Sequence, residues 1–182
     1  TGNVYVTGYS RNVVIVDYDW ATVMLNSAGA QQWVMRYGGS SAELDRANDV
    51  VVDATGNAYV TGNAKNTSTN EDLIVIKYDN VGAQLWVKSY NSLANNFDEG
   101  KSLKLNATGT YLYVGGSSNV GVSLNDFYTL KLRTSDGLID WGTRYNGPGN
   151  GADLNFDLAL DAMENVYICG QTTGSGTGSD FM

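Results

Sequence analysis

The feature that most constrains this chain is a repeat with a period of 54 residues. Tyrosines in the similar contexts VYV, AYV, LYV and VYI recur at Tyr5, Tyr59, Tyr113 and Tyr167. Two further series keep nearly the same spacing, namely Trp33, Trp86 and Trp141, and Asp19, Asp72, Asp126 and Asp180. Three markers with one period indicate a chain built from stacked copies of one supersecondary unit, as in solenoids and propellers.

The clearest copy of the unit runs from Asp49 to Tyr90 and contains four short apolar segments separated by turn residues. β-branched and aromatic residues fill the segments, and Gly, Asn and Asp separate them, which is the pattern of strands joined by tight turns. We predict strands in this copy over 49–53, 58–62, 73–78 and 84–90. The other copies predict strands over 1–8, 19–26, 31–37, 101–106, 111–115, 127–132, 139–145, 157–161 and 166–170. No segment keeps the apolar spacing of a helix.

The period also predicts how the chain is divided. Its 182 residues hold roughly 3.4 copies of the unit, which we treat as one repeat array. We expect a partial unit of three strands over 1–37, complete units over 38–90 and 91–145, and a partial unit over 146–182. The last unit is expected to lack its third and fourth strands. Because the chain starts and stops inside units, we expect a fragment of a longer protein.

Four antiparallel strands per unit, repeated without helices, predict the blades of an all-β propeller. One four-stranded sheet cannot bury both faces, and radial stacking buries each face against a neighbouring sheet. Each tryptophan of the series precedes a tyrosine by four residues, so both rings point to one face of a strand. We interpret these pairs as packing between blades. About 3.4 blades are fewer than the roughly four to eight that close a propeller, so we expect an open arc prone to self-association.

The lengths of the connections predict where a binding surface lies. Turns after the first and third strands of a unit are short, for example 54–57 and 79–83. Connections after the second and fourth strands are longer, over 63–71, 117–125, 171–179, 38–48, 91–98 and 146–156. In an up-and-down sheet, all long connections emerge on one side, which we call the long-loop face. Since variable loops on a rigid scaffold carry most binding residues, we expect the binding surface there.

Charge and composition exclude several classes of protein. With 11 Lys and Arg against 19 Asp and Glu, the net charge is −8, and an acidic surface repels the phosphates of nucleic acids. No apolar run approaches the roughly 20 residues that a membrane-spanning helix needs. The single cysteine, Cys169, excludes an intramolecular disulfide. It occupies the place of Thr7 and Thr61 in other copies, so we expect a small side chain packed in a strand.

Acidic residues recur on the long-loop side of the predicted sheets. Asp45, Asp98 and Asp153 are equivalent by spacing, and so are Asp49 and Asp157, with Ser102 at the matching place of the copy between them. We expect them near the mouth of a central channel, where a ring of carboxylates could bind ligand or hold Ca²⁺ with its roughly six to eight oxygen ligands. Aspartate also caps turns, and we favour this second interpretation and predict no cofactor.

The sequence offers little support for catalysis. The chain has no histidine, which removes Ser-His-Asp and Cys-His arrangements, histidine zinc sites and the commonest general base. The 19 Asp and Glu residues are numerous enough for a glycosidase-like pair of carboxylates, but the sequence does not show the separation that such a pair needs. No Walker or Rossmann glycine motif is present. We predict no enzymatic activity and assign no catalytic residues.

Three motifs together resemble a known family. GNAYVTG at 56–62, DLIVIKYDNVGAQLWVKSYN at 72–91 and DRANDVVVDATGN at 45–57 are similar to the bacterial β-propeller repeat called the SBBP repeat. The third copy departs from it with TYLYVGG and RTSDG, and Trp20 stands where the other copies carry Leu73, Phe127 and Phe181. The resemblance implies a propeller of secreted or surface-attached bacterial proteins, and it brings no catalytic residues to carry over.

The leading functional hypothesis is a non-catalytic scaffold that binds a protein or a glycan through the long-loop face. The first alternative is an enzyme of the quinone-cofactor propeller type, because DNVGAQLW resembles the turn and docking tryptophan of those blades. The second is a purely structural spacer in a multidomain adhesin. In each case we expect the remainder of the propeller as a partner.

Overall fold

The computed structural model describes most of the chain, namely residues 2–11, 18–38, 44–65, 70–92, 96–121, 124–176 and 178–182. This part of the chain contains fourteen β-strands and no helix, which confirms the predicted all-β class. None of the described residues therefore forms a helix able to cross a membrane.

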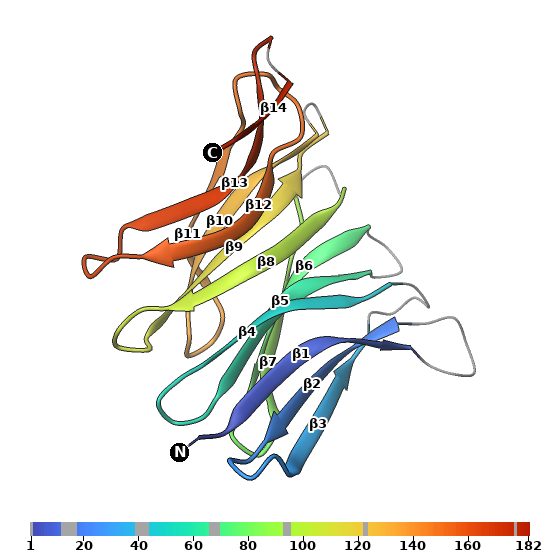
Figure 1. Ribbon diagram of the computed structural model, residues 1–182, viewed down its shortest axis with the longest axis vertical. Helices are drawn as coiled ribbons and strands as arrows, with labels where there is room; N and C mark the ends of the chain where they lie inside the picture. Colours follow the sequence, from blue (N-terminus) through green and yellow to red (C-terminus); the bar gives the residue numbers. More distant parts are fainter. Residues whose placement is uncertain are drawn as a thin grey trace.

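The strands form four antiparallel sheets that follow one another along the chain (Figure 1). The first contains β1 (Val4–Arg11), β2 (Tyr18–Leu25) and β3 (Gln31–Tyr37). The second contains β4 (Arg46–Val52), β5 (Ala58–Lys65), β6 (Glu71–Tyr78) and β7 (Gln84–Tyr90). The third contains β8 (Asp98–Leu105), β9 (Tyr111–Asn119), β10 (Asn125–Arg133) and β11 (Ile139–Tyr145), and the fourth β12 (Leu154–Leu160), β13 (Val166–Gly174) and β14 (Gly178–Phe181).

The sheets stack one after another in an open fan, with the two chain ends at opposite ends of it (Figure 1). The first strands of the last three sheets, β4, β8 and β12, contact each other in sequence. Strand order inside each sheet follows chain order, so β7 and β11 lie at the edges away from these contacts. These are the stacked antiparallel blades of a propeller, as the repeat predicts.

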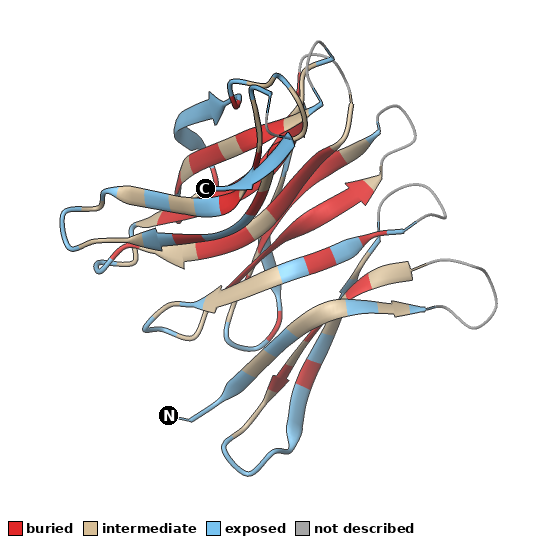
Figure 2. Ribbon diagram, turned by 45° about the horizontal axis from the view of Figure 1, so that its top comes forward, coloured by how far each residue is buried: buried red, intermediate tan, exposed pale blue. Residues whose placement is uncertain are grey.

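The core lies between the sheets. Apolar side chains of the second and third sheets form one buried layer, which consists of Tyr59, Leu73, Val75, Leu103, Leu112, Val114, Leu130 and Leu132. Figure 2 shows that buried residues concentrate in the middle sheets, whereas strands at both ends of the fan are more exposed. Each fully buried leucine or valine contributes about 1.5–3 kcal/mol, so the contacts between sheets supply much of the stability.

Several strands are longer than predicted. The second strands continue to Lys65, Asn119 and Gly174, and the third strands β6 and β10 begin at Glu71 and Asn125. Backbone groups make the ladder, so Ser, Asn and Gly extend it although they carry no strand signal. The same reason explains β14, which pairs with β13, so the expectation that the last unit lacks a third strand is wrong.

The first strands also begin earlier than predicted, because each contains a β-bulge at the same place. The register shifts between Ala47 and Asp49 in β4, and between Gly100 and Ser102 in β8. β12 repeats the shift between Asn155 and Asp157. One extra residue breaks the alternation of the pattern, so periodicity cannot follow the strand across it.

Aspartate and glycine shape the tight turns. Asp53 Oδ1 accepts hydrogen bonds from the backbone N–H groups of Thr55 (2.9 Å) and Asn57 (3.0 Å). Asp79 Oδ1 does the same in the next turn for Val81 and Ala83. Gly56 follows Thr55 with a φ of 87°, a conformation that favours glycine. Asp53 and Asp79 therefore cap the tight turns that the sequence predicts over 54–57 and 79–83.

The tryptophans dock between sheets. Trp33 Nε1 donates to the carbonyl oxygen of Asn80 in the following sheet at 3.3 Å. Trp86 Nε1 donates to the carbonyl oxygen of Thr134 at 3.2 Å, one sheet further along. Each bond ties the last strand of one sheet to the tight turn of the next, which confirms the packing interpretation for Trp33 and Trp86. The third member of the series, Trp141, is exposed.

The expectation for Cys169 is wrong, because this side chain is exposed. Its equivalent in the second sheet, Thr61, is buried against the third sheet, where Gly100 lies next to it. Among the described residues no further sheet covers the face of the fourth sheet that carries Cys169, and this leaves the thiol in contact with solvent.

Candidate functional site

The long-loop face carries a pocket where the second and third sheets meet. Its volume is about 480 Å³, and eight described residues line it: Lys65, Asn70, Glu71, Asn96, Phe97, Asn119, Gly121 and Leu124. They come from the β5–β6, β7–β8 and β9–β10 connections and the strand ends beside them. All three are long connections, so the pocket lies on the face where we expect the binding surface.

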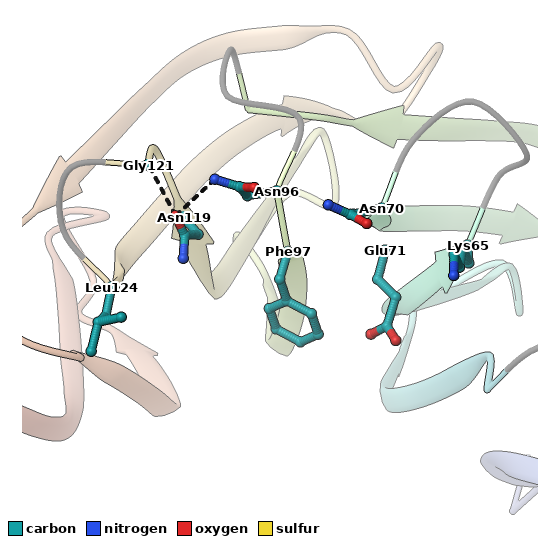
Figure 3. A pocket seen from close by; sticks show the side chains of 8 residues that line it. All are labelled: Lys65, Asn70, Glu71, Asn96, Phe97, Asn119, Gly121 and Leu124. Atoms are coloured by element: carbon teal, nitrogen blue, oxygen red, sulfur yellow. Dashed lines mark hydrogen bonds between the residues drawn. The ribbon is translucent and has the colours of Figure 1, made fainter.

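The loop walls of the pocket are joined by the amide of Asn119, at the end of β9. Its Oδ1 accepts hydrogen bonds from Asn96 Nδ2 at 3.1 Å and from the backbone N–H of Gly121 at 2.9 Å (Figure 3). The backbone N–H of Asn119 donates to the carbonyl oxygen of Phe97 at 3.0 Å. One residue thus orders two loops and fixes the backbone that carries Phe97.

The opposite wall comes from the second sheet. Glu71 starts β6, and its Oε2 accepts a hydrogen bond from Nδ2 of the buried Asn63 at 2.7 Å. Lys65 ends β5, and its backbone N–H donates to Asp45 Oδ1 at 2.9 Å. Figure 3 shows the side chains of Glu71 and Phe97 projecting in the same direction.

The chemistry of the pocket is polar and close to neutral. It carries one cation and one carboxylate, Lys65 and Glu71, together with three side-chain amides. Phe97 adds a half-buried aromatic ring. Amides and carboxylates bind hydroxyl groups, and an aromatic face packs against apolar C–H groups, so the pocket suits a neutral polyhydroxylated ligand.

The structure buries the recurring aspartates Asp45, Asp98 and Asp153 completely. Asp98 accepts hydrogen bonds from the backbone N–H of Ser92 at 2.6 Å and from the hydroxyl of Ser118. These partners belong to the preceding loop and to the end of the second strand in its own sheet. Asp98 therefore clamps the β7–β8 connection to β9.

Asp153 repeats this arrangement in the fourth sheet. Its carboxylate accepts hydrogen bonds from the backbone N–H of Gly147 at 2.6 Å and of Thr173 at 3.0 Å. The hydroxyl of Thr172 adds a third at 2.5 Å. Asp45 accepts a hydrogen bond from the backbone N–H of Lys65 in the same way, so one buried aspartate in each of the last three sheets orders the base of the long loops. Burial raises the pKa of Asp98, and hydrogen bonds from Ser118 and Ser92 oppose the rise.

The second predicted set lies along the first strands. Asp49 Oδ2 accepts a hydrogen bond from the backbone N–H of Leu103 in the next sheet at 2.7 Å. Asp157 Oδ1 lies 3.7 Å from Lys104 Nζ. Burial raises the pKa of Asp49; its backbone hydrogen bonds and Lys104 lower it, and the negative charge of Asp157 raises it. The structure thus brings Asp49 and Asp157 into one electrostatic environment around Lys104.

The two sets do not combine into a cation site. Within the described ranges, no three acidic, histidine or cysteine side chains gather closely enough to hold a metal ion. Asp45, Asp98 and Asp153 belong to separate sheets, and the partners given above are protein groups of the surrounding loops and strands.

The residues that line the pocket were not singled out from the sequence. Glu71, Phe97 and Asn119 fall inside the predicted long connections, but none belongs to a periodic series. The position of Phe97 is occupied by Leu44 and Ala152 in the other copies, just before each buried aspartate. An apolar residue before the aspartate in two copies is the one signal that could have drawn attention to Phe97.

Comparison with known proteins agrees with this architecture. Residues 32–68 match the family model of the SBBP repeat, described as a beta-propeller repeat. The matched segment covers β3, β4 and β5 and the connections beside them. A search of curated proteins gave no significant match.

Proposed function

We propose that this chain, in which residues 32–68 are an SBBP beta-propeller repeat, is a non-catalytic module that binds a neutral glycan on its long-loop face. The observation that carries the proposal is the pocket between the second and third sheets, where Phe97 lies among amides and one carboxylate. The resemblance to secreted and surface-attached bacterial propellers supports work outside the cell, where glycans are abundant.

The pocket favours a glycan over a nucleic acid or another acidic ligand. Its two charged residues, Lys65 and Glu71, have opposite signs, and the whole chain carries a net charge of −8. An anionic ligand would meet repulsion and only one cation. A sugar ring offers hydroxyl groups to Asn96 and Glu71 and a C–H face to Phe97.

The side chains available support a non-catalytic role. The chain has no histidine, and the pocket has a single carboxylate, Glu71, whereas glycoside hydrolysis uses a pair of carboxylates on either side of the bond. The described lining of the pocket can hold a sugar in place, and it lacks the second acid or base that cleavage needs.

The proposal is tested with an immobilised panel of neutral and acidic oligosaccharides, followed by calorimetry with the best neutral ligand. We expect Phe97→Ala to weaken binding at least about tenfold, because loss of a stacked ring costs about 1.5 kcal/mol. Val81→Ala is the matched control, since Val81 is exposed in a tight turn on the opposite face. Binding restricted to acidic sugars, or equal losses in both variants, would contradict the proposal.

A further inference from the structure

The connection between β11 and β12 contains the two Asn-Gly pairs of the sequence. They are Asn146-Gly147 and Asn150-Gly151. In such a pair the backbone nitrogen of the glycine can attack the side-chain amide of the asparagine, because glycine has no Cβ to hinder the approach. Both pairs are therefore candidate sites of spontaneous deamidation, and the structure distinguishes them.

Deamidation of an Asn-Gly pair consumes only water. The glycine nitrogen loses its proton and forms a bond to Cγ of the asparagine, and the bond between Cγ and Nδ2 breaks to release ammonia. Water then opens the cyclic imide at either carbonyl group. One product is aspartate, and the other is isoaspartate, in which the main chain runs through Cβ and is longer by one atom. The reaction thus requires a glycine nitrogen that is free to attack.

The first pair is protected by the buried aspartate of the fourth sheet. The backbone N–H of Gly147 donates to Asp153 Oδ2 at 2.6 Å, and both residues are buried. The hydroxyl of Thr172 and the backbone N–H of Thr173 also donate to Asp153, which fixes the carboxylate in place. A charge-assisted hydrogen bond must break before the Gly147 nitrogen attacks Asn146, and this raises the barrier.

The second pair lacks this protection. Asn150 is exposed, and the N–H of Gly151 makes no hydrogen bond with any residue that the structure describes. Asn150 Oδ1 accepts a hydrogen bond from Asn146 Nδ2 at 2.9 Å. This donor stabilises the negative charge that develops on Oδ1 when the glycine nitrogen attacks Cγ. The same dipeptide is therefore held back at one position and left open at the other.

The connection has no room for a longer main chain beside Asn150. A Cβ built on Gly149 would lie 2.5 Å from the carbonyl oxygen of Thr173, and a Cβ built on Gly151 would lie 2.6 Å from Thr173 Cβ. The backbone N–H of Gly149 also donates to the carbonyl oxygen of Thr173 at 2.9 Å. An additional main-chain atom at Asn150 would push this connection away from the end of β13.

We propose that Asn150 is a site of spontaneous deamidation, and that isoaspartate formed there loosens the long-loop face of the fourth sheet. Asp153 spares the neighbouring pair by holding the nitrogen of Gly147. Because the ammonia is lost to solvent, the change is irreversible and accumulates with the age of the folded chain. The modification is independent of the pocket between the second and third sheets.

The test is incubation of the whole 182-residue chain in mildly alkaline buffer, followed at intervals by trypsin digestion and tandem mass spectrometry. No lysine or arginine follows Arg144, so one peptide, residues 145–182, contains both pairs. We expect Asn150 to be converted at least about tenfold faster than Asn146, because attack on Asn146 must first break a charge-assisted hydrogen bond. In denaturant this hydrogen bond is absent, and both asparagines should react at similar rates.

Asn150→Gln is the matched variant, because it keeps an exposed amide whose longer side chain closes a larger and less favoured ring. We expect the melting temperature of the wild type to fall during incubation and that of Asn150→Gln to stay constant. Equal rates at Asn146 and Asn150 in the folded chain, or no conversion at Asn150, overturn the assignment of the site. Conversion of Asn150 without a fall in melting temperature overturns the predicted loosening of the connection.

Discussion

Asp53 and Asp98 show that the surroundings of an aspartate decide the direction in which its pKa shifts. Asp53 sits in a tight turn, where burial raises its pKa but the hydrogen bonds donated by Thr55 and Asn57 outweigh burial and lower it. Asp98 lies fully buried beneath the long loops, where burial dominates and raises the pKa. The two carboxylates therefore contribute to stability with opposite dependence on pH.

The lowered pKa of Asp53 predicts a specific response to acid. Its folded-state value lies below the ordinary 3.8, so the stabilisation is fully present above pH 3.8 and is lost as the pH falls through the folded-state value. We expect Asp53→Asn to lower the free energy of unfolding by about 1 kcal/mol at neutral pH. This difference in the free energy of unfolding should become smaller in acid. Chemical denaturation at several pH values between neutral pH and about pH 3 measures it.

Asp140→Asn provides the control for this measurement. Asp140 is exposed on β11. This variant should leave stability at neutral pH unchanged. If the free energies of unfolding of Asp53→Asn and the wild type differ by the same amount at every pH, ionisation of Asp53 does not stabilise the turn.

At the scale of elements, the distance between the second and third sheets depends on a small residue in the first strand of the third sheet. A Cβ built on Gly100 in β8 would clash with Thr61 Oγ1 and lie 3.1 Å from Thr61 Cβ in the neighbouring sheet. Thr61 is buried and donates a hydrogen bond to the carbonyl oxygen of Ile74 at 2.9 Å, so it cannot move freely. The close approach of the second and third sheets therefore requires a glycine here.

We expect Gly100→Ala to destabilise the chain by about 1–3 kcal/mol, because overpacking pushes the two sheets apart. Gly8→Ala is the matched control in another strand, since its Cβ would meet no atom within 4 Å. Thermal unfolding of both variants measures the effect. A melting temperature of Gly100→Ala equal to that of Gly8→Ala would mean that the sheets absorb the added methyl group without cost.

At the scale of the whole molecule, the buried aspartates order the loops through hydrogen bonds with protein groups. Each of them binds protein groups from its own surroundings, and the described residues hold no group of three metal ligands. The fan of sheets is held together by apolar layers and by tryptophans that dock on the following sheet.

This arrangement predicts that calcium has no effect on stability. We expect the melting temperature to stay the same with added calcium chloride or with EDTA, because no ligand set among the described residues changes occupancy. Differential scanning calorimetry of the whole chain measures this directly. A rise of several degrees with calcium, reversed by EDTA, would show that the acidic residues form an ion site.

The long-loop face illustrates what residue patterns can and cannot reveal about a site. Connection lengths were enough to predict the side of the sheets on which the pocket lies. Successive antiparallel strands end on opposite sides of a sheet, so every second connection emerges on the same side. Phe97, Asn96 and Glu71 come from different connections, and they become neighbours only when two sheets stack. No spacing along the chain encodes that meeting, whereas Asp45, Asp98 and Asp153 recur with the repeat and could be found from it.

The sequence by itself determined the repeat, the order of strands within each sheet and the two kinds of connection, since these depend on local alternation and turn residues. Only the tertiary structure decided where β-bulges interrupt the first strands and which aspartates are buried. It also decided which equivalent residues of the repeat are buried, since Val60 is buried and Val6 is exposed. Such features arise from pairing between strands and from packing between loops and sheets, and the alternation within one segment carries no record of them.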